Sequence, residues 1–177
     1  VKMSFELFDT TRLNIKPLNE RVHDIDLLEV LVPVDDSPAP MDNEKVRNIA
    51  KALCEAKQKK ADSTLMYGAH VIRTGNSDYM IELMRRGLVT HFATNGAGSI
   101  HDYEFSLIGH TCESVAKYIS EGQFGLWRET GYINEIIKEG VEDGLGAGEA
   151  IGRYIWEQNL PYKEHSVLAN GYRMHVP

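Results

Sequence analysis

Apolar side chains recur along the chain with two spacings, which predict alternating helices and strands. Between Asp42 and Lys60, Val46, Ile49 and Leu53 follow the i, i+3, i+4 rule of an amphipathic helix. The unbroken apolar run at 64–67 is typical of a strand buried in a parallel sheet. The same reasoning predicts strands over 88–93 and from 166, and helices over 76–86, over 102–109, from 111, over 132–138 and over 148–158.

The first forty-one residues follow neither spacing for long. Prolines at 17, 33, 38 and 40 interrupt regular structure, with one short strand predicted within 26–34 and a connecting loop over 34–40. We therefore expect an irregular N-terminal arm over 1–41, followed by one domain over 42–177.

From residue 42 onward the predicted strands and helices alternate. This order indicates the α/β class, with a Rossmann-like parallel sheet and helices on both faces, in three layers. The last predicted strand begins shortly before Pro177, and a doubly wound domain rarely ends there. We expect the chain to be the front part of a longer protein.

Composition narrows the class of protein. No apolar run approaches the roughly 20 residues of a membrane span, and the N-terminus lacks the layout of a secretory signal. The two cysteines, Cys54 and Cys112, give no disulfide framework and favour a reducing compartment. A net charge of −7 repels phosphate backbones. We expect a cytoplasmic protein that binds neither membranes nor nucleic acid.

A turn of small residues, Thr94-Asn95-Gly96-Ala97-Gly98-Ser99, lies between a predicted strand and a predicted helix. Ligands of open parallel sheets bind beyond the carboxyl ends of strands, and free amides at a helix start favour anions. The sequence therefore predicts a small-molecule site at this turn. The alternative is a turn that simply requires glycine.

Ionisable residues follow the turn directly. His101, Asp102 and Glu104 fall in the first turn of the next helix, where they can serve as acid and base or bind a cationic substrate. The equal alternative is that the two acids only complement the helix dipole. A histidine and an aspartate are too few ligands for a metal, so none is predicted.

The turn after the preceding strand carries further polar residues. His70, Arg73, Thr74 and Asn76 reach the same edge if the two strands are neighbours, and Arg73 can hold phosphate with two bonds. Each is also an ordinary solvated loop residue. The glycine-rich segment 144–148 is not a dinucleotide fingerprint, because it follows an acidic helical segment instead of a strand.

The two turns resemble those of deoxyhypusine synthase and its relatives. Thr74-Gly75 matches the end of that family's first turn, Thr94 to Gly98 match its second, and the stretch 76–93 between them has the expected length. The similar part spans about residues 64–104. The resemblance implies a Rossmann-like sheet, an NAD cofactor and a tetramer, hence a homo-oligomer.

The resemblance also implies roles for individual residues. NAD is assigned to Thr74, Gly75, Thr94, Asn95, Gly96, Ala97 and Gly98, and the substrate to His101, Asp102 and Glu104. The chain departs from the family at His70, Arg73, Ile100 and His101, and the family's imine-forming lysine lies in a part that this chain lacks. The substrate is therefore left unassigned.

Three functional hypotheses follow. The first is a deoxyhypusine-synthase-like, NAD-binding protein that acts on a small amine. The second is a non-catalytic module that binds a nucleotide or another anion at the same turns. The third is a structural subunit whose arm, residues 1–40, mediates assembly.

Overall fold

The computed structural model describes residues 5–34 and 42–177, which mix helices with short strands. The strands are β1 (His23–Asp26), β2 (Thr64–Tyr67), β3 (His91–Thr94) and β4 (His110–Glu113). The helices are α1 (Leu27–Val30), α2 (Glu44–Gln58), α3 (Ala69–Arg73), α4 (Ser77–Arg85), α5 (Gly96–Ile108), α6 (Val115–Ser120), α7 (Arg128–Glu142), α8 (Ala147–Glu157) and α9 (Val167–Met174). Short 3₁₀ helices are η1 (Thr10–Arg12), η2 (Leu18–Glu20) and η3 (Lys163–His165).

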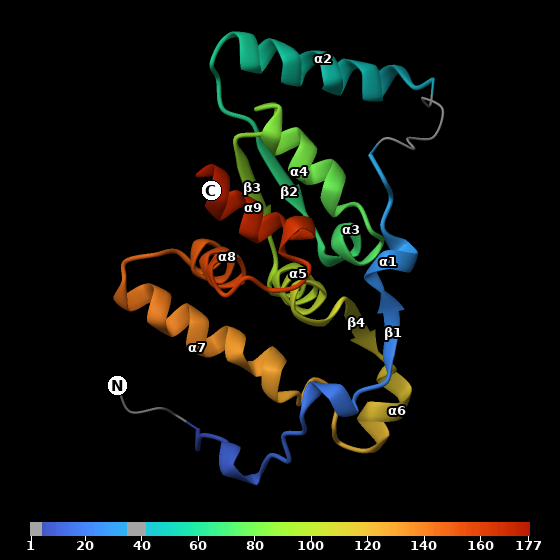
Figure 1. Cartoon of the computed structure of the whole chain (residues 1–177), viewed down its shortest axis with the longest axis vertical. Helices are drawn as coiled ribbons and strands as arrows, with labels where there is room; N and C mark the ends of the chain where they lie inside the picture. The colour runs from blue at the N-terminus through green and yellow to red at the C-terminus, as the bar shows by residue number, and fades with distance from the viewer. Residues whose placement is uncertain (1–4, 35–41) are drawn as a thin grey trace.

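β2 and β3 form a parallel pair near the centre of the chain (Figure 1). Their register runs from Thr64 opposite His91 to Tyr67 opposite Thr94, so the carboxyl ends of both strands lie side by side. The predicted adjacency of these two segments is confirmed. Because this sheet has two strands within the described residues, the wider three-layer sheet stays a prediction.

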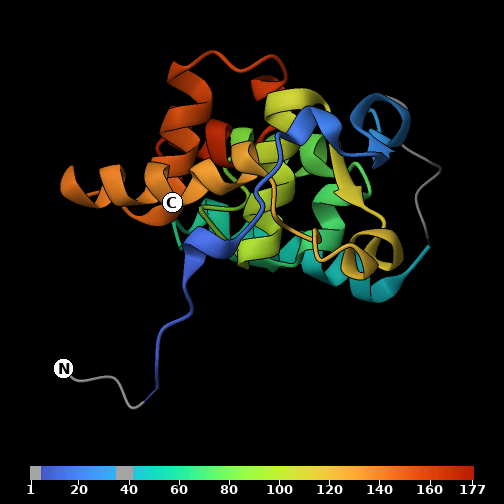
Figure 2. The same ribbon diagram turned by 90° about the horizontal axis from the view of Figure 1, so that it is seen from below.

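A second ribbon joins the N-terminal region to the rest of the chain. β1 pairs antiparallel with β4, with Ile25 opposite Thr111 and Asp26 opposite His110. In Figure 2 the first described residues extend away from the other elements before the chain turns back toward β1. The ribbon thus brings residues near position 21 against α5, where the candidate site lies.

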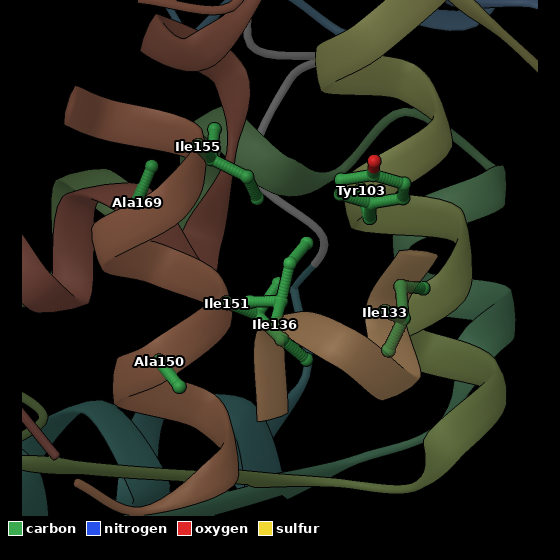
Figure 3. Close-up of a cluster of buried hydrophobic side chains, with 7 residues drawn as sticks. All are labelled: Tyr103, Ile133, Ile136, Ala150, Ile151, Ile155 and Ala169. Atoms are coloured by element: carbon green, nitrogen blue, oxygen red, sulfur yellow. The ribbon is translucent and has the colours of Figure 1, made fainter. Parts of the chain in front are cut away.

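One apolar cluster packs α5 against α7, α8 and α9 (Figure 3). Each large aliphatic side chain buried there contributes about 1.5–3 kcal/mol. Its buried members are Tyr103, Ile133, Ile136, Ala150, Ile151, Ile155 and Ala169. A second cluster, around Ile72, Met80 and Phe105, supports the inner faces of β2 and β3. The two clusters hold α5 rigidly from two sides.

Elements with strong local signals form as predicted. The helices predicted over 42–60, 76–86 and 148–158 are α2, α4 and α8. The strand predicted at 64–67 is β2, but it is not buried as predicted, because the side chains of Thr64 and Met66 are exposed. The helix predicted over 132–138 belongs to the longer α7. The predicted loop 34–40 lies outside the described residues from position 35 on.

Three predictions near the candidate site are wrong. The strand predicted from 166 is helix α9, because Ser166 caps it by accepting a hydrogen bond from the Ala169 amide at 2.9 Å. The helix predicted from 111 begins only at Val115, since residues 110–113 pair with β1 as β4. The helix predicted at 102 begins at Gly96, so the glycine turn is itself the first turn of α5.

Two strand predictions need smaller corrections. The strand within 26–34 lies earlier, as β1, because Asp26 accepts a hydrogen bond from the Leu28 amide at 2.8 Å and starts α1. The strand over 88–93 begins three residues later as β3. No helix in the described part of the chain is long and apolar enough to cross a membrane.

Candidate functional site

A cavity of about 850 Å³ lies beside α5, within the ~300–1,000 Å³ usual for ligand sites. Its walls come from β1, α3, α5, β4 and the segment that leads into α7, elements that can be followed in Figure 1. The ionisable side chains that line it are Arg21, Asp24, Arg73, His101, Glu104, Cys112 and Glu113. We refer to it as the α5 cavity.

Glu104 is the most strongly bound side chain of the α5 cavity. Arg21 donates to both carboxylate oxygens at 2.8 Å, and Thr111 and Thr130 donate their hydroxyl protons at 2.7 and 2.6 Å. Burial acts to raise the pKa of Glu104, but these donors and the Arg21 charge outweigh it and lower the pKa. Glu104 is therefore an ionised, fully occupied anchor.

His101 lies one turn before Glu104 on the same face of α5. Its Nδ1 is 2.8 Å from the Thr111 hydroxyl oxygen. Burial lowers the pKa of His101, and the positive charges of Arg73 and Arg21 lower it further against the opposing effect of Glu104. The ring is consequently neutral at neutral pH and can accept a proton or a hydrogen bond.

Arg73, at the end of α3, brings a positive charge to the wall of the α5 cavity. Its Nε is buried and has no hydrogen-bond partner, and its guanidinium forms no ion pair within the described residues. A buried guanidinium nitrogen left unbonded is costly, and Arg73 lines the α5 cavity, where its guanidinium can pair with a bound anion. Asp24, on β1, lines the same cavity and likewise has no ion pair in the described part of the chain.

Cys112 lines the α5 cavity but is not activated. Its backbone has a φ of 63°, and its sulfur lies 4.0 Å from Nδ1 of His101. Burial raises the pKa of Cys112, so the group is a neutral thiol at neutral pH. We assign it no nucleophilic role.

The structure separates the three predicted acid–base residues. His101 and Glu104 line the α5 cavity, whereas Asp102 is fully buried on another face of α5 and does not line it. Asp102 accepts hydrogen bonds from the Ser166 hydroxyl at 2.5 Å and the Val167 amide at 2.8 Å. Burial raises the pKa of Asp102 to about 6. It therefore caps α9.

The predicted glycine turn is only partly available to a ligand. Asn95 caps α5 by accepting from the Gly98 amide at 2.9 Å, and residues 95–97 are exposed. Gly98 is buried, and it must be glycine because a Cβ there would collide with the Thr94 hydroxyl. Ala97 lines the α5 cavity, whereas Thr94 lines a different one.

The turn after β2, which contains Thr74 and Gly75, contributes more to packing than to contact with a ligand. Gly75 has a φ of 77° and lies against the backbone of Val30, so only glycine fits there. The Thr74 hydroxyl donates to the carbonyl of His70 at 2.6 Å. Of the polar residues predicted at this turn, Arg73 alone lines the α5 cavity. The assignment of these positions to NAD stays a prediction.

A second cavity, of about 430 Å³, lies at the carboxyl ends of β2 and β3. Tyr67 and Thr94 line it together with Gly146 and Gly148, from the glycine-rich segment before α8. That segment joins α7 to α8, as predicted, and does not follow a strand. The second cavity has fewer ionisable residues than the α5 cavity.

Sequence reasoning missed the residues that hold Glu104 in place. Arg21 comes from the predicted arm, 83 positions away in sequence, and Thr111 falls in a predicted helix although it belongs to β4. One signal was present: a glutamate among the apolar residues of α5 requires a buried cationic partner. No feature of the neighbouring sequence indicated which cationic residue is that partner.

Comparison with known proteins identifies one family. The model of the family described as "Arginine dihydrolase ArgZ-like, C-terminal, Rossmann fold" matches residues 47–163, more than half of the chain. No curated protein matches the chain. The Rossmann fold and the α/β class are thus confirmed.

The match also overturns the first functional hypothesis. The resemblance to deoxyhypusine synthase, and the interpretation of the chain as a deoxyhypusine-synthase-like NAD-binding protein, are wrong, because the matched family is a different one. The physical reason is that a short glycine-containing connection from strand to helix recurs throughout parallel α/β folds. Thr74-Gly75 and Thr94 to Gly98 therefore report the fold and not the family.

Proposed function

This chain belongs to the family of ArgZ-like, C-terminal, Rossmann-fold domains of arginine dihydrolases, and on that premise we propose that its α5 cavity binds an amino acid of the arginine class. The observation that carries the proposal is the guanidinium of Arg73 in the cavity wall, which forms no ion pair within the described residues. An α-carboxylate is the group of such an amino acid that pairs with a guanidinium through two hydrogen bonds.

The remaining charges of the cavity suit the other end of the same ligand. Asp24 offers a carboxylate without an ion pair in the described residues, which can bind a cationic side chain. His101 is neutral and can accept a hydrogen bond from an ammonium group. A zwitterion with an additional positive charge therefore complements Arg73, Asp24 and His101 together.

The other charged residues of the α5 cavity already have partners, which leaves Arg73 and Asp24 available to a ligand. The Arg21 guanidinium donates to both oxygens of Glu104 at 2.8 Å and, through Nε, to Nδ1 of His23 at 3.0 Å. Glu113 accepts from the Trp127 indole at 2.8 Å and from the Gly125 amide at 2.9 Å. Arg21 and Glu113 thus shape the cavity, while Arg73 and Asp24 line it with charged groups that form no ion pair within the described residues.

Isothermal titration calorimetry with L-arginine tests the proposal. We expect the wild-type chain to bind, and Arg73→Gln to weaken binding about tenfold or more through loss of a charge-assisted pair. Arg12→Gln removes an equal charge from an exposed position outside the cavity and should bind like wild type. Absence of binding to the wild-type chain, or equal weakening by both variants, would reject the proposal.

A further inference from the structure

A chain of hydrogen bonds runs from Arg21 to His101 through the floor of the α5 cavity. Arg21 donates twice to Glu104, Thr111 donates to Oε2 of Glu104 at 2.7 Å, and the Thr111 oxygen is 2.8 Å from Nδ1 of His101. Thr111 is completely buried, so water does not compete for its hydroxyl group.

The hydrogens available along this series of hydrogen bonds determine which nitrogen of the His101 ring is protonated. The ionised carboxylate of Glu104 can only accept hydrogen bonds, so the single hydroxyl proton of Thr111 is donated to it. The Thr111 oxygen can then only accept from its other neighbour. Nδ1 of His101 must therefore carry a proton, which leaves Nε2 with a free lone pair on the neutral ring.

We propose that Glu104, acting through Thr111, fixes His101 as the Nδ1–H tautomer, so that the α5 cavity presents Nε2 as a hydrogen-bond and proton acceptor. This tautomer is the opposite of the one that predominates in free neutral histidine. Glu104 and Thr111 are positioning residues, and neither needs to touch a ligand. The ligand must then place a donor, such as an ammonium or guanidinium group, against Nε2. Only this last statement rests on the proposed function.

The charges around His101 maintain the acceptor state. Burial and the charges of Arg73, Arg21 and His70 lower the pKa of His101, and only Glu104 acts in the opposite direction. Cys112 is neutral beside the ring. The ring is therefore ready to take up a proton from a bound ligand and does not enter the site already protonated.

Nitrogen NMR on the ligand-free chain tests the tautomer directly. In protein labelled with ¹⁵N-histidine, long-range proton–nitrogen spectra at pH 7 distinguish the protonated ring nitrogen from the bare one, and His101→Gln assigns the signals. We expect His101 to show protonated Nδ1 and bare Nε2. A protonated Nε2 in the wild-type chain would overturn the proposal.

Three variants of hydroxyl-bearing residues test whether Thr111 positions His101 or only supports the fold. Thr111→Ser keeps the hydroxyl and should keep the tautomer, whereas Thr111→Val should shift His101 toward Nε2–H. Thr130→Val is the matched control, because it removes a donor to Glu104 that does not reach His101. An unchanged tautomer in a folded Thr111→Val, or an equal change in Thr130→Val, would count against Thr111. If Thr111→Val does not fold, the wild-type and Thr111→Ser spectra decide.

Adding L-arginine to the same sample separates this proposal from the proposed function. If the ligand binds as proposed, the bare Nε2 signal moves while Nδ1 stays protonated. If no signal moves but the ligand-free tautomer is Nδ1–H, the ligand assignment fails and the positioning role of Thr111 is supported.

Discussion

Arg21 and Glu104 form a two-bond ion pair between the N-terminal region and the middle of α5, with both side chains almost completely buried. The guanidinium of Arg21 also lies 5.9 Å from the ring centre of Trp127. The pair therefore fixes three parts of the chain at one point, and it sets the floor of the α5 cavity.

Breaking the pair should strongly destabilise the fold. Arg21→Met leaves the buried Glu104 carboxylate without its cation, which costs about 3–5 kcal/mol in the free energy of unfolding. Urea denaturation followed by circular dichroism measures this cost. Arg85→Met is the control, because Arg85 pairs with Glu82 on the surface and its loss should change little. Similar losses in both variants would contradict a dominant role for the buried pair.

Asp102 should make stability depend on pH in the mildly acidic range. Its pKa is raised from 3.8 to about 6 in the folded chain, mainly by burial, so the folded state binds this proton more tightly than the unfolded state. The resulting stabilisation is complete below the unfolded pKa and is lost as pH rises to 6, by about 3 kcal/mol.

The comparison with Asp102→Asn isolates this effect. The amide keeps an acceptor for the Val167 amide but does not titrate, and the other titrating groups are shared by both proteins. The free energy of unfolding of wild type relative to the variant should therefore fall between pH 4 and pH 6. A constant difference across that range would show that Asp102 does not titrate as inferred.

Substituting alanine for two glycines of α8 should change the stability of the fold by different amounts. A Cβ at Gly152 would collide with the carbonyl group of Leu168 in α9, so Gly152→Ala should cost about 1–3 kcal/mol. A Cβ at Gly148 meets only the end of the Leu168 side chain at 3.8 Å, and alanine there should be neutral or slightly stabilising. Thermal unfolding of both variants measures the contrast, and equal melting temperatures would refute the close packing of α8 on α9.

Arg73→Gln should affect binding without harming the fold. Because the Nε of Arg73 has no partner in the described residues, its removal breaks no native hydrogen bond at that atom. We expect the unfolding free energy to change by less than about 1 kcal/mol. A large destabilisation, measured by urea denaturation, would show that Arg73 serves the fold and not a ligand.

The sequence predicted those elements whose signals are local. The spacing of Val46, Ile49 and Leu53 indicates α2, and the apolar run at 64–67 indicates β2, although β2 also needs its pairing with β3. Strand β4 could not be predicted in this way, because it exists through pairing with β1 far away in the chain. Helix α9 resembles a strand locally and depends on Asp102, which is 64 positions from Ser166.

The candidate site could likewise be predicted from the sequence only in part. His101, Glu104 and Arg73 follow predicted strands in the sequence and are candidates on that ground, and the structure brings them together in the α5 cavity. Their roles depend on partners that only the fold supplies. Arg21 turns Glu104 into an anchor, and Thr111 decides which nitrogen of His101 faces the cavity with a lone pair.

Comparing L-arginine with agmatine, which lacks the α-carboxylate, in wild type and Arg73→Gln tests most directly whether Arg73 anchors an amino acid in the α5 cavity. Calorimetry should show that wild type binds L-arginine about tenfold or more tightly than agmatine, and that this preference disappears in Arg73→Gln. Equal affinities for the two compounds in wild type, or a preference that survives in the variant, would contradict it.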